Sequence, residues 1–195
     1  MRARLMWLCR HRAGTVRAAW RFPRHTALLA LFAAGAACAQ APAPAPPSKA
    51  CAAPVHRQFD FWIGRWDVFL PNGNKAGENV IESIADGCAL LESWTGRGGV
   101  TGKSLNVHDA RDGRWHQTWV DSSGGRLELA GTFGDGRMVL ASTVGEIGKP
   151  GDRSVQRITW TPNPDGSVRQ LWESSDDGGV TYRVAFDGRY VKRKE

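Results

Sequence analysis

Turn-forming residues recur at a spacing of about ten residues along the chain from position 55 onward. They occupy residues 71–74, 109–113, 121–125, 134–136, 162–166, 176–179 and 187–188. Candidate strands lie between them, at residues 65–70, 77–85, 88–95, 101–108, 114–121, 125–133, 136–144, 153–161, 167–174 and 179–186. Short connections favour an antiparallel meander, and a meander of about ten strands removes its exposed edges by closing into a barrel. We therefore expect an all-β up-and-down barrel with a short helix within residues 55–63. The alternative, an immunoglobulin-like sandwich, needs longer crossover connections.

The N-terminal segment has the layout of a secretory signal. Residues 1–25 are basic, and residues 26–37 form an uncharged apolar run, shorter than the roughly 20 residues that a transmembrane helix needs. Ala37-Cys38-Ala39 matches a small-x-small cleavage site. We expect a signal peptide at residues 1–39, cleavage between Ala39 and Gln40, and a periplasmic or secreted protein without a transmembrane span. A lipoprotein anchored through Cys38 is the alternative.

The positive net charge of this chain does not indicate that it binds nucleic acid. The formal charge is +7, from 26 Lys and Arg against 19 Asp and Glu. Seven of the Arg residues lie in residues 1–39, which carry no acid, so the rest of the chain is neutral. A neutral domain lacks the basic surface that nucleic acid requires, and we predict no nucleic-acid partner. The sequence gives no indication of the oligomeric state.

A Pro/Ala-rich stretch separates the signal from the folded domain. We interpret residues 40–54 as an extended linker and residues 55–195 as the barrel domain. Cys51 and Cys88 are the cysteines left after cleavage, and two thiols in an oxidising compartment favour a disulfide. A buried free thiol at Cys88 is the alternative.

Tryptophan alternates with amides or a carboxylate in several candidate strands. The residues that share a face in this way are Glu92 and Trp94; Trp115, Gln117 and Trp119; Gln156 and Trp160; and Gln170 and Trp172. An aromatic lining with a few polar groups is typical of a ligand cavity. We therefore predict that a small, largely apolar molecule binds inside the barrel. The candidate site residues are Glu92, Trp94, Gln117, Trp119, Gln170 and Trp172.

Two other interpretations of the tryptophan faces remain open. A filled core would use the Gln and Glu side chains to satisfy the indole N–H groups, and the protein would then be a structural or interaction module of the cell envelope with a protein partner. Alternatively, the tryptophans lie outside and form a partner surface. For residues 179–186 the alternation places Val180, Tyr182, Val184 and Phe186 on one side, against Thr181, Arg183 and Ala185.

Signals for catalysis and metal binding are weak. After the leader, only three histidines remain, His56, His108 and His116, and no metal-ligand motif accompanies them. We expect no metal, although His108 and His116 could approach each other across one hairpin. Whether the protein is an enzyme stays uncertain, with a non-enzyme favoured.

Two polar arrangements keep the enzyme hypothesis open. Ser104, Asn106 and His108 alternate along one candidate strand and would form an inward polar row. The favoured interpretation places that row on the solvent side of a hairpin. Glu92 facing Glu173 would form a carboxylate pair, but we favour separate roles because two buried carboxylates repel each other.

The start of the domain resembles a known class of barrels. Residues 59–68 contain Gly64-x-Trp66 after the expected short helix, similar to the opening of lipocalin and nitrobindin barrels, the calycins. The resemblance implies a calycin-like barrel in which Trp66 packs across the base against a basic residue of the last strand, here Arg183, Arg189 or Lys192.

A wider resemblance covers residues 57–190, which look like a bacterial exported domain of unknown function with the same barrel. It is carried by residues 59–68, 87–94, 115–121 and 169–174, and it implies a fold without an activity. Nitrobindin-like barrels bind haem through a late histidine, but no histidine follows position 116 here. We therefore expect no cofactor.

Overall fold

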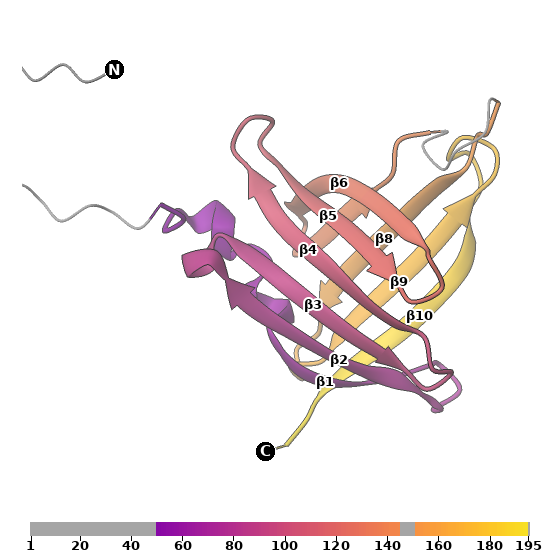
Figure 1. Ribbon diagram of the computed structural model, residues 1–195, viewed down its shortest axis with the longest axis horizontal. Helices are drawn as coiled ribbons and strands as arrows, with labels where there is room; N and C mark the ends of the chain where they lie inside the picture. The colour runs from indigo at the N-terminus through magenta and orange to yellow at the C-terminus, as the bar shows by residue number, and fades with distance from the viewer. Residues whose placement is uncertain (1–49, 145–150, 195) are drawn as a thin grey trace, which may run out of the picture. The chain divides into compact units, whose positions relative to one another are not determined.

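The computed structural model describes residues 50–144 and 151–194. The predicted signal peptide, the candidate lipid-bearing Cys38 and nearly all of the predicted linker lie outside the described residues. In the described part, ten strands form one closed antiparallel barrel (Figure 1). Each strand pairs with its neighbour in the sequence, and β1 pairs with β10 to close the sheet. The predicted all-β up-and-down barrel with a short N-terminal helix is confirmed.

The secondary-structure elements follow one another with short connections. The strands are β1 Gly64–Phe69, β2 Lys75–Ile84, β3 Ala89–Gly96, β4 Thr101–Asp109, β5 Arg114–Asp121, β6 Arg126–Gly134, β7 Arg137–Ala141, β8 Val155–Pro162, β9 Val168–Ser175 and β10 Arg183–Lys192. Three short 3₁₀ helices accompany them: η1 Pro54–Arg57, η2 Asp60–Trp62 and η3 Ala85–Gly87. No helix in the described segments is long and apolar enough to cross a membrane.

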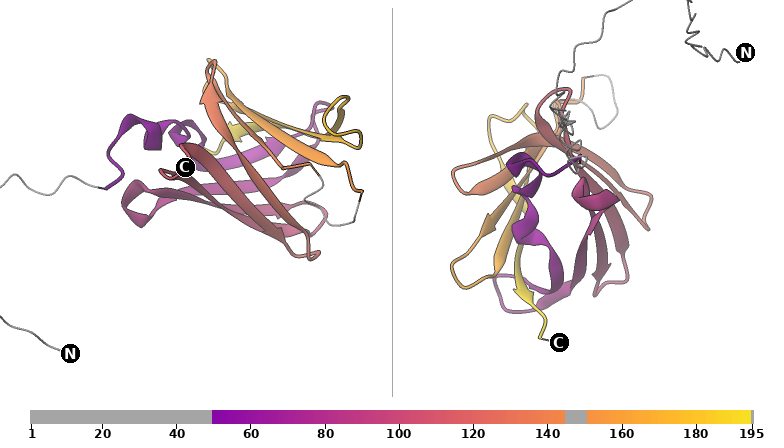
Figure 2. Two further views of the ribbon diagram at one scale, coloured as in Figure 1. Left: turned by 90° about the horizontal axis from the view of Figure 1, so that it is seen from above. Right: turned by 90° about the vertical axis from the view of Figure 1, so that its left-hand side faces the viewer.

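One end of the barrel is closed by the segment that carries η1 and η2 (Figure 2). Phe59 and Trp62 from this segment are fully buried and stack with ring centroids 5.0 Å apart. Trp160 of β8 packs against both rings, at 5.2 and 5.3 Å. Trp66 of β1 donates from its indole Nε1 to the backbone oxygen of Trp62 at 2.9 Å. Burial of these large rings makes this end, called the closed end below, a filled aromatic core.

The base of the barrel has the cation that the calycin resemblance implies. Lys192, on β10, places its Nζ 5.4 Å from the centre of the Trp66 ring. Arg189 instead binds the carboxylate of Asp165 at 2.6 Å, and Arg183 binds an exposed aspartate near the opposite end of the barrel. Of the three expected candidates, Lys192 therefore faces Trp66.

A disulfide between Cys51 and Cys88 ties the residues before η1 to the start of β3, with the Cα atoms 5.1 Å apart. The predicted pairing is confirmed. The bond holds the capping segment against the barrel independently of the aromatic contacts.

The last strand differs from the prediction. Residues 179–186 were expected to form it, with a turn at residues 187–188, but β10 begins at Arg183 and continues to Lys192. Val180 and Val184 are 78% and 62% exposed, whereas Phe186 packs against the core, so the predicted apolar side does not stay on one face. A β-bulge between Val184 and Phe186 changes the register at that point. Gly188 lies inside the strand, where an added Cβ would be 2.5 Å from the Phe186 ring. This glycine makes room for an aromatic ring and does not form a turn.

Candidate functional site

All six predicted ligand residues occupy inward-facing positions of their strands. Alternation along β3, β5 and β9 puts each carboxylate or amide on the same face as its tryptophan. Glu92, Gln117 and Gln170 are buried, whereas the three tryptophans are only half-buried. The half-buried tryptophans are Trp94, Trp119 and Trp172. The barrel therefore groups the predicted residues into a polar set and an aromatic set.

Glu92 is the centre of the polar set. Its Oε1 accepts a hydrogen bond from Nδ2 of Asn79 at 2.6 Å, and its Oε2 accepts one from Oγ of Ser104 at 2.6 Å. Burial raises the pKa of the Glu92 carboxyl, and the two hydrogen bonds oppose that rise. The carboxyl consequently keeps its proton to a higher pH than an exposed glutamate.

The polar set extends around the inner wall in both directions from Glu92. On one side, Asn106 donates from Nδ2 to the Ser104 hydroxyl at 2.9 Å, and Gln117 donates from Nε2 to Oδ1 of Asn106 at 2.8 Å. On the other side, Asn79 contacts the Tyr190 hydroxyl at 3.3 Å, and that hydroxyl donates to Oε1 of Gln170. We call these seven side chains the polar layer: Asn79, Glu92, Ser104, Asn106, Gln117, Gln170 and Tyr190.

The surroundings of Tyr190 in the polar layer change the pKa of its hydroxyl. Tyr190 is 2% exposed, and desolvation together with the nearby Glu92 charge raises the pKa of its hydroxyl. The hydroxyl therefore stays protonated and acts as a hydrogen-bond donor and acceptor. It links the two halves of the layer through Asn79 and Gln170.

Four aromatic side chains line the barrel on the side of the polar layer away from the closed end. They are Trp94, Trp119, Trp172 and Phe186, all half-buried; we call them the aromatic wall and that end the open end. Trp94 and Phe186 meet edge to face, 6.3 Å apart. The indole N–H of Trp172 donates to Gln156 at 2.6 Å, and that of Trp119 to Asp121 at 3.3 Å. The polar edges of two indoles are thus already engaged by the protein.

Glycines on neighbouring strands let two of these indoles lie close against the sheet. An added Cβ on Gly102 of β4 would be 2.1 Å from the Trp119 ring, and one on Gly77 of β2 would be 2.6 Å from the Trp94 ring. Both distances are too short for a real Cβ contact. The glycines therefore hold the rings against the inner surface of the barrel.

The row of Ser104, Asn106 and His108 points inward, so its interpretation as the solvent side of a hairpin is wrong. Ser104 and Asn106 are 2% and 0% exposed and belong to the polar layer. His108 lies nearer the closed end, 5.9 Å from the Trp115 ring and 5.4 Å from the His56 ring. Hydrogen bonding within the layer makes it favourable to bury polar side chains of this strand.

Two other proposed pairings do not form. Glu173 lies on the outer face, where its carboxylate binds Arg157 at 2.9 Å, so it does not face Glu92. His108 and His116 lie on opposite faces of the sheet, because His108 pairs with Trp115 and His116 pairs with Val107. His108 points into the barrel and His116 points out of it, so the sheet separates the two imidazoles.

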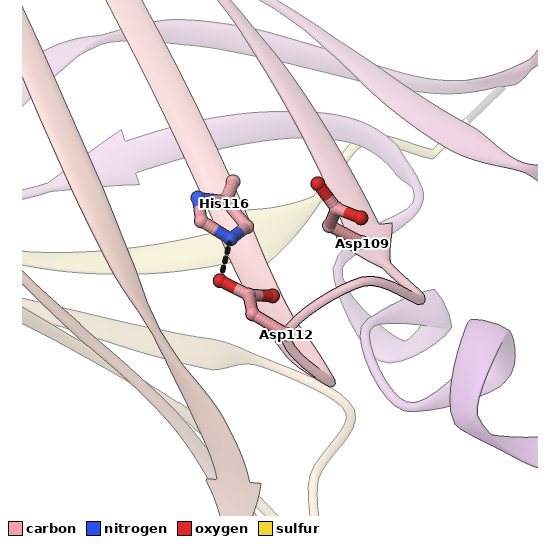
Figure 3. A group of neighbouring side chains, drawn as sticks. All are labelled: Asp109, Asp112 and His116. Carbon is pink, nitrogen blue, oxygen red and sulfur yellow. Dashed lines mark hydrogen bonds and ion pairs between the residues drawn. The ribbon is translucent and has the colours of Figure 1, made fainter.

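A small acidic group at the β4–β5 turn was not expected from the sequence (Figure 3). Asp109, Asp112 and His116 place one ligand atom each within 4.8 Å of one another. Arg111 already binds the Asp109 carboxylate, which lowers the pKa of that carboxyl, and His116 binds Asp112 at 2.8 Å. A cation would have to displace Arg111 from Asp109 and break the contact between His116 and Asp112, so existing ion pairs account for the group.

Two inward residues of the site, Asn79 and Tyr190, were missed by sequence reasoning. Asn79 alternates with Gly77 and Ile81 along β2, and this alternation would have identified it. Tyr190 lies beyond the predicted end of the last strand. Phe186 was seen, but the bulge beside it could not be read from the pattern.

Comparison with known proteins adds no family to this description. A scan against protein-family models gave no match, and a search of curated proteins gave no significant match.

Proposed function

We propose that the open half of the barrel binds a small, largely apolar molecule. In this proposal Trp94, Trp119 and Trp172 pack against the molecule. Glu92, Gln117 and Gln170 orient it from the polar layer beneath.

The contrast between the two ends of the barrel carries the proposal. At the closed end, Trp62, Trp66 and Trp160 are 0% exposed, as in a packed protein core, while Phe61 and Phe133 at its edge are half-buried. At the open end, four aromatic side chains also face inward and yet remain half-buried. Inward apolar surface that the protein itself does not cover is characteristic of ligand sites.

Unused hydrogen-bonding capacity in the polar layer supports the same proposal. Among the described residues, no hydrogen bond engages Oε1 of Gln117 or Nε2 of Gln170, although the other end of each amide is held within the layer. One acceptor and one donor are therefore fixed in place. Such groups orient a ligand whose body is bound by apolar contacts.

The chain also supports export as part of the proposal. The basic segment followed by a short apolar run has the layout of a secretory signal, and disulfides such as Cys51–Cys88 persist in oxidising compartments. We propose a periplasmic or secreted location, with anchoring through a lipid on Cys38 as the alternative.

A second candidate function is an interaction module of the cell envelope. It is favoured by apolar side chains on the outer face of β4 and β5, where Leu105, Val107 and Val120 are 53%, 39% and 49% exposed. Exposed apolar groups on neighbouring strands are typical of partner surfaces.

The test is a titration with the neutral apolar fluorophore N-phenyl-1-naphthylamine. The Trp119→Ala variant should lose about tenfold in affinity, because it removes a large aromatic contact worth over 1 kcal/mol. Val120→Ala is the matched control, since Val120 is the next residue of β5 and points outward. Equal binding by wild type and Trp119→Ala would discard the site.

A second experiment separates the two candidate functions. Native mass spectrometry of the protein from its own host should find a small bound mass that disappears on denaturation. A clean unbound mass, together with no fluorophore binding, would favour the interaction module.

A further inference from the structure

Above the closed end, the inner wall of the barrel carries acids that are not paired with a cation. Among the inward-facing strand positions that the structure describes, the acids are Glu92 in the polar layer and Asp121 beside Trp119. Turn hydrogen bonds from Ser123 and Gly125 lower the pKa of Asp121 to about 2, so it is an anion at neutral pH. Of the cations at inward strand positions, Lys192 lies against Trp66 at the closed end. Arg183, at the open end of β10, pairs with Ser174 and binds the carboxylate of Asp176. A ligand at the open end therefore meets Glu92 and Asp121, while Arg183 at the rim is already paired with Asp176.

The polar layer has more free acceptors than free donors. Oδ1 of Asn79 is buried without a hydrogen-bond partner among the described residues, although Asn79 is only 1% exposed. Each oxygen of Glu92 accepts one hydrogen bond from the described residues, while a carboxylate can accept about four. Oε1 of Gln117 adds another free acceptor. The free acceptors thus outnumber the free donor, Nε2 of Gln170, and a ligand could supply the missing donors.

The aromatic wall presents ring faces more than polar edges. The indole N–H groups of Trp119 and Trp172 are engaged by Asp121 and Gln156, and the Trp119 ring lies against Gly102. The faces of aromatic rings are electron-rich and attract organic cations. The ring faces therefore attract a positive group electrostatically, as do the acids Glu92 and Asp121 near them.

These three observations point to one kind of head group. We propose that the molecule bound inside the barrel carries a protonated amine, which donates hydrogen bonds to the acceptors around Glu92 while its apolar part packs on the aromatic wall. The proposal rests on the proposed ligand-binding function and adds the chemical class of the ligand. Acids such as fatty acids are excluded by it, because their carboxylate would face Glu92 and Asp121 without a counter-charge.

Glu92 is suited to this role by its surroundings. Burial raises the pKa of its carboxyl in the free protein, and the hydrogen bonds from Ser104 and Asn79 only partly offset that rise. An ammonium group beside Glu92 stabilises the carboxylate form. Binding of the amine is thus accompanied by proton release from Glu92 whenever the free carboxyl is protonated.

The experiment compares three probes with the same ten-carbon chain: decylammonium, decanol and decanoate. Affinities are measured at neutral pH and below micelle-forming concentrations, by isothermal titration calorimetry. Wild type should bind decylammonium about tenfold more tightly than decanol, the size of one desolvated cation–π or ion-pair contribution. Decanoate should bind most weakly.

Variants then locate the selectivity. Glu92→Gln keeps the side-chain shape and should bring the affinity for decylammonium down to that for decanol. Glu128→Gln removes a carboxylate from the outer face of β6 and should leave the order of the three probes unchanged. Circular dichroism establishes that each variant is folded.

The outcomes separate the two proposals. Binding of decanol with equal or tighter binding of decanoate overturns the amine proposal and leaves the binding barrel standing. An unchanged amine preference in folded Glu92→Gln also overturns it. If no probe binds wild type, the proposed binding function fails and the inference fails with it. The wild-type series alone decides between these results if Glu92→Gln does not fold.

Discussion

The contact between Gly102 and Trp119 offers a direct test of how the aromatic wall is held. Gly102 of β4 faces inward, and the Trp119 indole lies where a side chain would otherwise be. An added Cβ would be 2.1 Å from Cζ2 and 2.2 Å from Cη2 of that ring. Gly102→Ala therefore forces the indole away from the sheet.

The size of the effect follows from this geometry. Ordinary contacts begin at 3.4 Å, so the ring must move by roughly 1 Å or more, a shift large enough to disturb a packed side chain. Its hydrogen bond to Asp121, 3.3 Å long, weakens as it moves. Overpacking of this kind costs about 1–3 kcal/mol. A loss of about 2 kcal/mol lowers the melting temperature by roughly 4–8 °C in a domain of this size.

The assay is urea and thermal unfolding followed by circular dichroism. Gly134→Ala is the matched control, because Gly134 is also a strand glycine but an added Cβ there meets nothing within 4 Å. That variant should be neutral or more stable by about 0.5 kcal/mol, since alanine restricts the unfolded chain. The Gly102→Ala variant should also bind N-phenyl-1-naphthylamine more weakly.

A double-mutant cycle assigns the cost to the ring itself. In the Trp119→Ala background the indole is gone, so Gly102→Ala should cost nearly nothing. The expected coupling energy between the two sites is about 1–3 kcal/mol. An equal cost of Gly102→Ala in both backgrounds, or a cost no larger than that of Gly134→Ala, would refute the reasoning.

Two further predictions concern stability. Burial raises the folded-state pKa of Glu92. The stability that the protonated carboxyl contributes to the folded protein is therefore fully present below the ordinary pKa of 4.5. It is lost as the pH rises through the folded-state pKa. Wild type should therefore lose more unfolding free energy than Glu92→Gln as the pH is raised above 4.5 in urea titrations; parallel pH profiles would count against this. Replacing both Cys51 and Cys88 by serine should lower the unfolding free energy by about 2–4 kcal/mol, and reductant should destabilise wild type but not this variant.

The fold could be predicted because its pattern is local. Turn residues and two-residue alternation depend only on neighbouring positions, and in an up-and-down barrel each strand pairs with the next one in the sequence. The Cys51–Cys88 bond followed from the number of cysteines and the expected compartment. The prediction failed at β10, where Asp187-Gly188 has the composition of a turn but lies within a strand.

The candidate site could be predicted only in part. Alternation shows which residues share a face, but it does not show which face is inside. Polar residues such as Ser104 and Asn106 favour solvent in isolation, and only the hydrogen bonds between strands make their burial favourable. Asn79 and Tyr190 join the same network from β2 and β10, positions far apart in the sequence. Such contacts become visible once the barrel closes.

The polar layer is difficult to explain by stability alone. At the closed end the same chain fills the barrel with apolar rings, led by Trp62, Trp66 and Trp160. In the polar layer next to this end, the chain buries a carboxyl together with several amides and hydroxyls. An apolar core of similar volume is commonly as stable as a buried polar network or more so. A protein that needed only a solid core could have continued the aromatic packing. The layer instead supplies fixed polar groups beneath an aromatic wall that is left half-buried, which is the arrangement that recognition of a small molecule requires.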